Sequence, residues 1–206
     1  MDPHPVTSRD SSINETTDEL CQAWVSACLY FDEQSAKQVL AQSFAVFSVE
    51  HVWLEVLRAG MSHSGQARYP GDVTVQQEHF ATSLATRQLD SLLAAAPSPT
   101  RDGRILAANP PQEDHVFGLL LLTLLLRRAG WDVVYLGANV PINRIAETLS
   151  DGIFRLVVSS AQLLHTAASL KEMGSVIQSV GVPLVYGGRI FNLLPELRSR
   201  IPCVFL

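Results

Sequence analysis

The sequence predicts an α/β protein in two parts, an N-terminal four-helix bundle and a C-terminal domain on a doubly wound parallel sheet. Apolar residues recur at spacings of three and four up to about residue 95, which is typical of amphipathic helices. Later, short apolar runs alternate with helical segments, which indicates crossover units on a parallel sheet. Two prolines and several small residues mark a linker between these patterns. We therefore expect a disordered N-terminal tail over residues 1–15, the bundle over 16–96, the linker over 97–103 and the sheet domain over 104–206.

Capping signals and apolar spacing define the four helices of the bundle. Thr16 stands three residues before Glu19, which is the spacing of a capping box, so the first helix should begin there. A third helix should start near Ser48, and a second capping box, formed by Thr74 and Gln77, marks the start of the fourth. The apolar positions of the first three helices are Leu20, Trp24, Cys28 and Phe31, then Ala36, Val39, Leu40, Phe44 and Phe47, then Val52, Val56 and Leu57.

Five short apolar runs are the expected strands: "RILAANP", "WDVVYLGA", "FRLVVSS", "VPLVYGG" and "CVFL". Helices are expected between them, over 116–129, 142–152, 166–181 and 194–201. Right-handed crossovers give a doubly wound, Rossmann-like or flavodoxin-like sheet. The sequence ends at the fifth strand, so we expect the final helix of such a domain to be missing.

Composition excludes several classes of function. The net charge is −5 and the pI is about 5.6, which argues against a nucleic-acid surface. The first fifteen residues have no apolar segment typical of a signal peptide. The leucine-rich run over 119–126 is far shorter than the ~20 residues of a membrane helix. We therefore expect a cytoplasmic protein that does not contact a membrane.

The loop after the first strand carries Glu113, Asp114 and His115 directly before a leucine-rich helix. It lies at the carboxyl edge of the sheet, where such folds bind ligands. Neutral imidazole is a common metal ligand, and Glu113 could hold its other ring nitrogen. One histidine and one carboxylate are too few for a bare zinc ion, so the pair suits a metal already held by a macrocycle. A histidine at a helix start can equally be a structural hydrogen-bonding group. Nucleotide-binding glycine motifs are absent from the sequence.

Three matched features resemble a known family. Residues 113–118 read E-x-H-x-x-G, which is similar to a variant of the cobalamin-binding D-x-H-x-x-G motif. Ser160 follows at an interval similar to that of the family's serine, and Gly187 with Gly188 matches its late double glycine. "LLRRAGWDVVYLGANVP" is also similar. The chain thus resembles, over residues 16–206, the cap and cobalamin-binding domains of light-responsive MerR-type transcriptional regulators.

The resemblance implies a role for each matched residue. His115 would be the lower axial ligand of cobalt, after the nucleotide tail of the cofactor has swung away, and Glu113 would orient the imidazole. The implied cofactor is cobalamin, as adenosylcobalamin or another corrinoid. Further residues would contact the cofactor or its tail, with the glycines letting the backbone approach closely: Gly118, Ser160, Gly187 and Gly188.

The resemblance also implies an upper side of the site, with departures. Glu78 and His79 match a Glu–His pair that faces the upper side of the corrin in these regulators. Arg68 stands where they carry a tryptophan that packs on the adenosyl group, and Tyr69 follows where some carry a histidine. We expect Arg68 and Tyr69 to border the cofactor in their place. Near the lower side, Gln162 replaces the leucine expected after the serine.

These features predict a cobalamin-binding sensory module and not an enzyme. No helix-turn-helix precedes the bundle in this sequence, so the module would act on a protein partner or by homo-oligomerisation, without direct nucleic-acid binding. Light or the cofactor state would change the contact between cap and sheet domain. The first alternative is a corrinoid carrier subunit of a methyltransferase. The second is a degenerate tetrapyrrole-binding interaction module.

Overall fold

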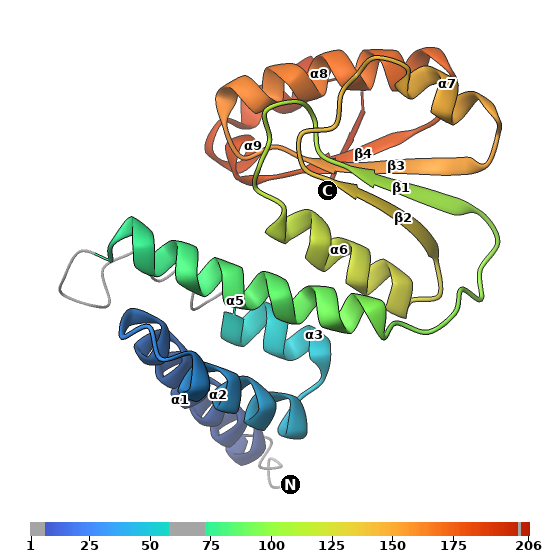
Figure 1. Ribbon diagram of the computed structural model, residues 1–206. Helices are drawn as coiled ribbons and strands as arrows, with labels where there is room; N and C mark the ends of the chain where they lie inside the picture. Colours follow the sequence, from blue (N-terminus) through green and yellow to red (C-terminus); the bar gives the residue numbers. More distant parts are fainter. Residues whose placement is uncertain (1–6, 58–72, 202) are drawn as a thin grey trace, which may run out of the picture. The chain divides into compact units, whose positions relative to one another are not determined.

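The computed structural model describes residues 7–57, 73–201 and 203–206 (Figure 1). The chain divides into two compact units, Met1–Gln88 and Leu89–Leu206. None of the helices in the described ranges combines the length and apolar character needed to cross a membrane.

The first unit is helical. Its elements are α1 (Thr7–Leu29), α2 (Glu33–Val46), the short α3 (Val49–His51), which continues as the π-helix η1 (Val52–Leu57), and most of α5 (Val75–Ala94). Its core is formed by apolar side chains that are almost completely buried, among them Trp24, Ala36, Leu40, Trp53, Val56 and Leu84.

Two of the predicted helix starts are confirmed and one is wrong. Ser48 accepts a hydrogen bond from the His51 backbone (3.2 Å), and Gln77 N donates to Thr74 Oγ1 (3.2 Å) while Thr74 N donates to Gln77 Oε1 (2.8 Å). By contrast, α1 begins at Thr7, so Thr16 lies inside the helix and the expected tail over 1–15 is helical from residue 7. Each polar residue in a helix interior costs at most roughly 0.7 kcal/mol. This cost is too small to prevent α1 from extending past the capping-box pattern toward the N-terminus.

The boundary between the units lies inside α5, and not in the linker predicted at 97–103. Leu89 is fully buried. The guanidinium of Arg127 donates to the carbonyl of Leu93 at 3.5 Å and to the carbonyl of Val133 at 2.8 Å. The last turns of α5 are therefore held by the second unit, a long-range effect that the composition of the linker does not reveal.

The second unit is a parallel five-stranded sheet in the order β2-β1-β3-β4-β5, which is one of the strand orders of a doubly wound sheet and confirms the predicted fold class. The strands are β1 (Arg104–Ala108), β2 (Asp132–Gly137), β3 (Phe154–Ser160), β4 (Leu184–Gly187) and β5 (Val204–Phe205). The connecting helices are α6 (Phe117–Arg128), α7 (Ile145–Ser150), α8 (Leu164–Ser179), α9 (Arg189–Leu193) and the 3-10 helix η2 (Pro195–Arg200). Helix α9 was not predicted from the sequence.

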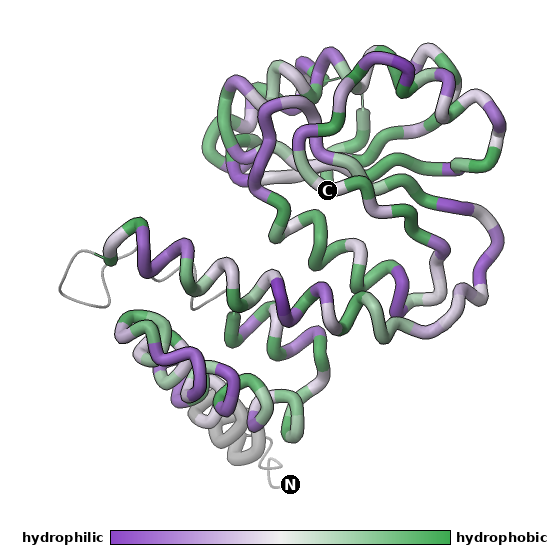
Figure 2. The backbone as a smooth tube through the Cα atoms, in the orientation of Figure 1, coloured by the Kyte–Doolittle hydropathy of each residue, from purple (hydrophilic) through white to green (hydrophobic). Residues whose placement is uncertain are grey.

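Helices cover both faces of the sheet, with α6 on one side and α7 and α8 on the other (Figure 1). Apolar residues are concentrated in the strands and in α6 (Figure 2). The α6 side includes Ile105, Leu119 and Val158, and the other side has Leu170 and Tyr186 at its centre. With both faces packed, the β1–α6, β2–α7, β3–α8 and β4–α9 loops remain at the carboxyl edge, where the candidate site lies.

Candidate functional site

His115 lies in the β1–α6 loop with its ring partly open to solvent. Its side chain is 58% exposed, and its Nδ1 lies 2.6 Å from Glu113 Oε1. A carboxylate can only accept, so Nδ1 carries the proton in the neutral ring and Nε2 keeps its lone pair. Within the described residues Nε2 makes no hydrogen bond. The loop therefore presents one oriented nitrogen that is free to bind a metal.

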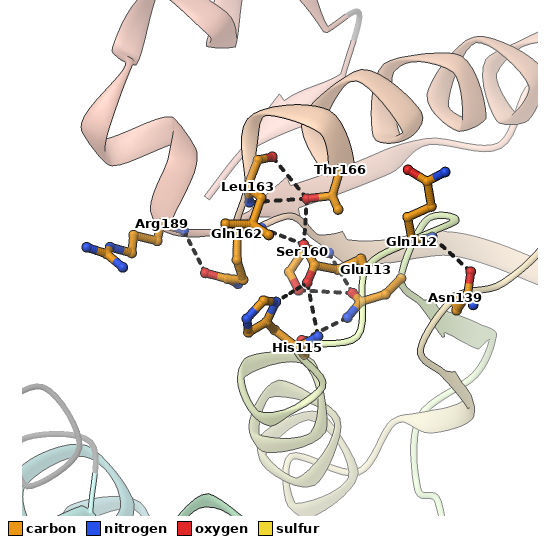
Figure 3. A network of polar contacts seen from close by, with 10 residues as sticks. Gln112, Glu113, His115, Asn139, Ser160, Gln162, Leu163, Thr166 and Arg189 are labelled. Atoms are coloured by element: carbon orange, nitrogen blue, oxygen red, sulfur yellow. Dashed lines mark hydrogen bonds and ion pairs between the residues drawn. The ribbon is translucent and has the colours of Figure 1, made fainter. Parts of the chain in front are cut away.

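Glu113 is completely buried and uses both carboxylate oxygens. Oε1 accepts from the backbone and the ring of His115, at 3.0 and 2.6 Å. Oε2 accepts from Gln162 N and from Thr166 Oγ1, both at 2.6 Å (Figure 3). Burial alone raises the pKa of Glu113, but the four hydrogen bonds together outweigh it and leave the pKa below its usual value. Glu113 is therefore a carboxylate at neutral pH, and it ties the histidine loop to the start of α8.

A second buried side chain, Asn109, fixes the backbone of the same loop. Its Nδ2 donates to the carbonyl of His115 at 3.0 Å. Its Oδ1 accepts from the backbone and hydroxyl of Ser160, at 3.0 and 2.9 Å. The hydroxyl of Ser160 is thus committed to Asn109, and the role of Ser160 toward the tail of a cofactor stays a prediction.

The β2–α7 loop supports the histidine loop from the other side. Asn139 Oδ1 accepts from Gln112 N at 2.8 Å, and Asn139 N donates to the carbonyl of Glu113 at 3.1 Å. The backbone of Asn109 also pairs with Gly137 and Val140, at 2.9 and 3.0 Å. Two neighbouring loops, β2–α7 and β3–α8, therefore hold the segment that carries the imidazole.

The matched glycines differ in their surroundings. Gly188 has φ +128° and ψ 161°, a conformation that is essentially restricted to glycine, and a Cβ there would overlap the carbonyl of Ala161. The backbone conformation and the packing of this turn therefore require a glycine at position 188 even without a cofactor. At Gly118, near the start of α6, no described atom lies within 4 Å of the position that a Cβ would take. Nothing in the fold itself demands glycine at Gly118.

The residues expected at the upper side belong to the first unit or lie outside the described residues. Glu78 and His79 are exposed on α5 and belong to the first unit. Arg68 and Tyr69 lie outside the described residues. The roles of all four stay predictions.

Sequence reasoning missed three residues of the network, Asn109, Asn139 and Thr166, and noted Gln162 only as a departure. Asn109 follows directly on the end of β1 and Asn139 is the second residue after β2, and a polar side chain at such a position is a usable signal. Thr166 gives no such signal, because its partner Glu113 is remote in the sequence.

A B12 binding domain model matches residues 103–206, and a second B12 binding domain model matches residues 20–93. The chain belongs to the B12-binding family. Its cofactor is cobalamin or a related corrinoid, as the sequence predicted.

Similarity to individual proteins of this family extends the assignment. The chain is 32% identical over 154 residues to the HTH-type transcriptional repressor CarH of Myxococcus xanthus, covering 75% of this chain and 46% of CarH. It is 37% identical over 67 residues to the repressor CarA of the same organism, covering 32% of this chain and 23% of CarA. The chain thus spans less than half the length of these relatives. A monomethylamine corrinoid protein from Methanosarcina barkeri has the same fold, with a TM-score of 0.73, 18% identity and coverage of 93% and 91% of the two chains.

The residues of this B12-binding chain fit a corrinoid. The described residues contain no group of three or more histidine, cysteine, aspartate or glutamate side chains that could hold a bare metal ion. The site offers a single oriented imidazole nitrogen, and a metal whose equatorial positions are filled by a ring needs only one such donor from below. His115 would be that donor and Glu113 its support.

Proposed function

We propose that this chain is the cobalamin-dependent sensory module of a regulator, and that it responds to light through the state of the cofactor. The observation that carries the proposal is the similarity to CarH over 154 residues. The second unit, 89–206, is shorter than that match, so the similarity includes part of the helical unit. Similarity across both units is expected of a sensor in which one unit binds the cofactor and the other responds to a change in the state of the cofactor.

His115 is the proposed lower axial ligand. Its Nδ1 is anchored by the buried Glu113, so the ring enters the complex already oriented and in the correct tautomer. Little rotational freedom is lost on binding, which favours histidine over water as the lower ligand. Cobalamin supplies a weak bond between cobalt and its upper group, and light can break that bond.

We propose that residues of the helical unit contact the upper side of the cofactor. Glu78 and His79 are exposed on α5 and available to a ligand, and Arg68 and Tyr69 are proposed to border the upper group. Loss of that group would remove a contact that the helical unit makes in one state alone, and such a differential contact would shift the equilibrium between states. The output is proposed to pass to a protein partner or to an oligomer of this chain.

The test is to load the purified chain with hydroxo-, methyl- or adenosylcobalamin in the dark, then record spectra and molecular mass before and after green light. A light-driven change in both, with adenosylcobalamin, is expected. Binding of methylcobalamin without any light-dependent change of mass would replace the sensor by a corrinoid carrier of a methyltransferase. Failure to bind any corrinoid would leave only an interaction module.

A matched pair of variants tests the ligand itself. His115→Ala keeps the backbone hydrogen bond to Glu113, so the fold is expected to survive while the spectrum of histidine-bound cobalt is lost. His165→Ala removes another exposed imidazole from the same edge of the sheet and should leave the spectrum unchanged. An unaltered spectrum in His115→Ala would refute the ligation.

A further inference from the structure

Gln162 lies in the β3–α8 turn and connects the histidine loop with the turn after β4. Its backbone N–H donates to Glu113 Oε2 at 2.6 Å, and its side-chain Oε1 accepts from Arg189 N at 3.0 Å. The neighbouring Ala161 N donates to the carbonyl of Gly187 at 3.0 Å. A leucine, which the family resemblance predicts at this position, could not make the contact with Arg189.

The contact with Arg189 N also fixes the orientation of the Gln162 amide. A backbone N–H donates, so the amide atom that faces it is the oxygen. The NH₂ group must then point away from Arg189 N, and no acceptor for it is found among the described residues. In Figure 3 the amide end of Gln162 points to the same side of the network as the ring of His115. Two N–H donors on that side of the network are therefore left without an acceptor among the described residues.

Arg189 adds a positive charge at the same turn. It follows Gly188 directly, its side chain is exposed, and within the described residues its guanidinium makes no ion pair or hydrogen bond. An amide NH₂ and an unpaired guanidinium on adjacent turns match an anionic oxygen acceptor. Cobalamin carries one such group, the phosphodiester of its nucleotide tail.

We propose that Gln162 and Arg189 recognise the tail phosphodiester and so select cobalamin over corrinoids that lack a nucleotide. The inference rests on the proposed ligation by His115, which leaves the tail displaced from cobalt on this side of the ring. Gln162 supplies orientation-specific hydrogen bonds and Arg189 supplies charge. Gln162 also holds the turn after β4 in place through its oxygen, so that the turn is already formed before the cofactor arrives.

The experiment measures dissociation constants in the dark for cobalamin and for cobinamide, which has no nucleotide or phosphodiester. In Gln162→Leu and in Arg189→Gln, affinity for cobalamin should fall roughly tenfold while affinity for cobinamide changes less than about twofold. The loss in Arg189→Gln should shrink as salt is raised, because the guanidinium is exposed. Two surface controls, Gln178→Leu and Arg200→Gln, lie away from the carboxyl edge and should change neither affinity.

Gln162→Glu separates recognition from support of the turn. A carboxylate can still accept from Arg189 N, but it has no N–H to donate and it repels a phosphodiester. We expect it to lose at least as much affinity for cobalamin as Gln162→Leu. An equal loss for cobalamin and cobinamide in any of the three variants, or no loss, would overturn the proposal. Absence of a light response would instead refute the proposed function, since the affinities are measured without light.

Discussion

Replacing Thr166 by valine tests whether the carboxylate network holds the second unit together. Thr166 is fully buried, and its hydroxyl has one proton and two acceptors in reach, Glu113 Oε2 at 2.6 Å and the carbonyl of Leu163 at 3.0 Å. The shorter distance and the charge assign the proton to Glu113. Valine has nearly the same shape, so the change removes this bond without opening a cavity.

The expected cost follows from the bonds that are lost. A hydrogen bond to a charged group contributes about 1.5–3 kcal/mol net. Leu163 N also loses its acceptor, Thr166 Oγ1 at 3.1 Å, which adds about 0.5–1 kcal/mol as a lost helix cap. We expect Thr166→Val to lower the free energy of unfolding of the second unit by about 2–4 kcal/mol. With a urea m-value of about 2 kcal/mol/M, the midpoint should fall by about 1–2 M.

The assay is hydrogen exchange of peptides from β1 and β3 in increasing urea, which reports on the second unit alone. Thr123→Val is the matched control, because Thr123 is also fully buried but donates only to the carbonyl of Leu119 inside α6. Thr166→Ser restores the hydroxyl and should regain most of the loss, less about 0.8 kcal/mol for one methyl group. A Thr166→Val variant within about 0.5 kcal/mol of Thr123→Val would refute the reasoning, since surface-like changes fall in that range.

Four further predictions concern the same edge of the sheet. The pKa of Glu113 is lowered in the folded state, so its contribution to folding stability is complete above the unfolded pKa of about 4.3 and is lost as pH falls through the folded pKa. Glu113→Gln should therefore be less stable than the wild type at pH 7. In acid titrations monitored by circular dichroism, it should also lose stability less steeply below about pH 4.3. Gly188→Ala should destabilise the apoprotein by roughly 3 kcal/mol or more in urea titrations. Gly118→Ala should leave the stability of the apoprotein equal or up to about 1 kcal/mol higher, and should weaken only the binding of cobalamin. Asn109→Ala should lower stability by about 2–4 kcal/mol and broaden the histidine-bound cobalt spectrum, because three hydrogen bonds in a buried position are lost. Glu113→Asp should weaken cobalamin binding about tenfold in spectroscopic titrations although it keeps the charge; affinity equal to wild type would show that the length of the side chain is irrelevant.

Much of the second unit could be predicted from the sequence because its strands are short apolar runs with a glycine or a polar residue at each end. The run "FRLVVSS" coincides with β3, and right-handed crossovers between such runs predict a doubly wound parallel sheet. The histidine loop was found for a similar reason. His115 and Glu113 are two residues apart, so their pairing is a local feature.

The support of the loop could not be predicted because it is made of contacts between remote segments. Asn109 meets Ser160, and Glu113 meets Thr166, only after β1 and β3 have paired. The same holds for the boundary inside α5, since the contact between Arg127 and Leu93 requires the second unit to be folded. Local patterns predict elements, whereas these contacts depend on which elements become neighbours.

The length of Glu113 accounts for a glutamate at this position where the related motif has an aspartate. The backbone of Glu113 is fixed at both ends, by N–H donation to the carbonyl of Pro110 and by its own carbonyl accepting from Asn139, each at 3.1 Å. From this fixed point the carboxylate must reach His115 with one oxygen and the β3–α8 turn with the other. An aspartate would withdraw both oxygens by about 1.5 Å, which would carry bonds of 2.6 Å beyond hydrogen-bonding distance unless the loop moved. The shorter residue could therefore orient the imidazole or join the turn, but could not do both on this backbone. The additional methylene of Glu113 allows one carboxylate to link the proposed cobalt ligand, His115, to the turn that carries Gln162. One side chain therefore positions both groups.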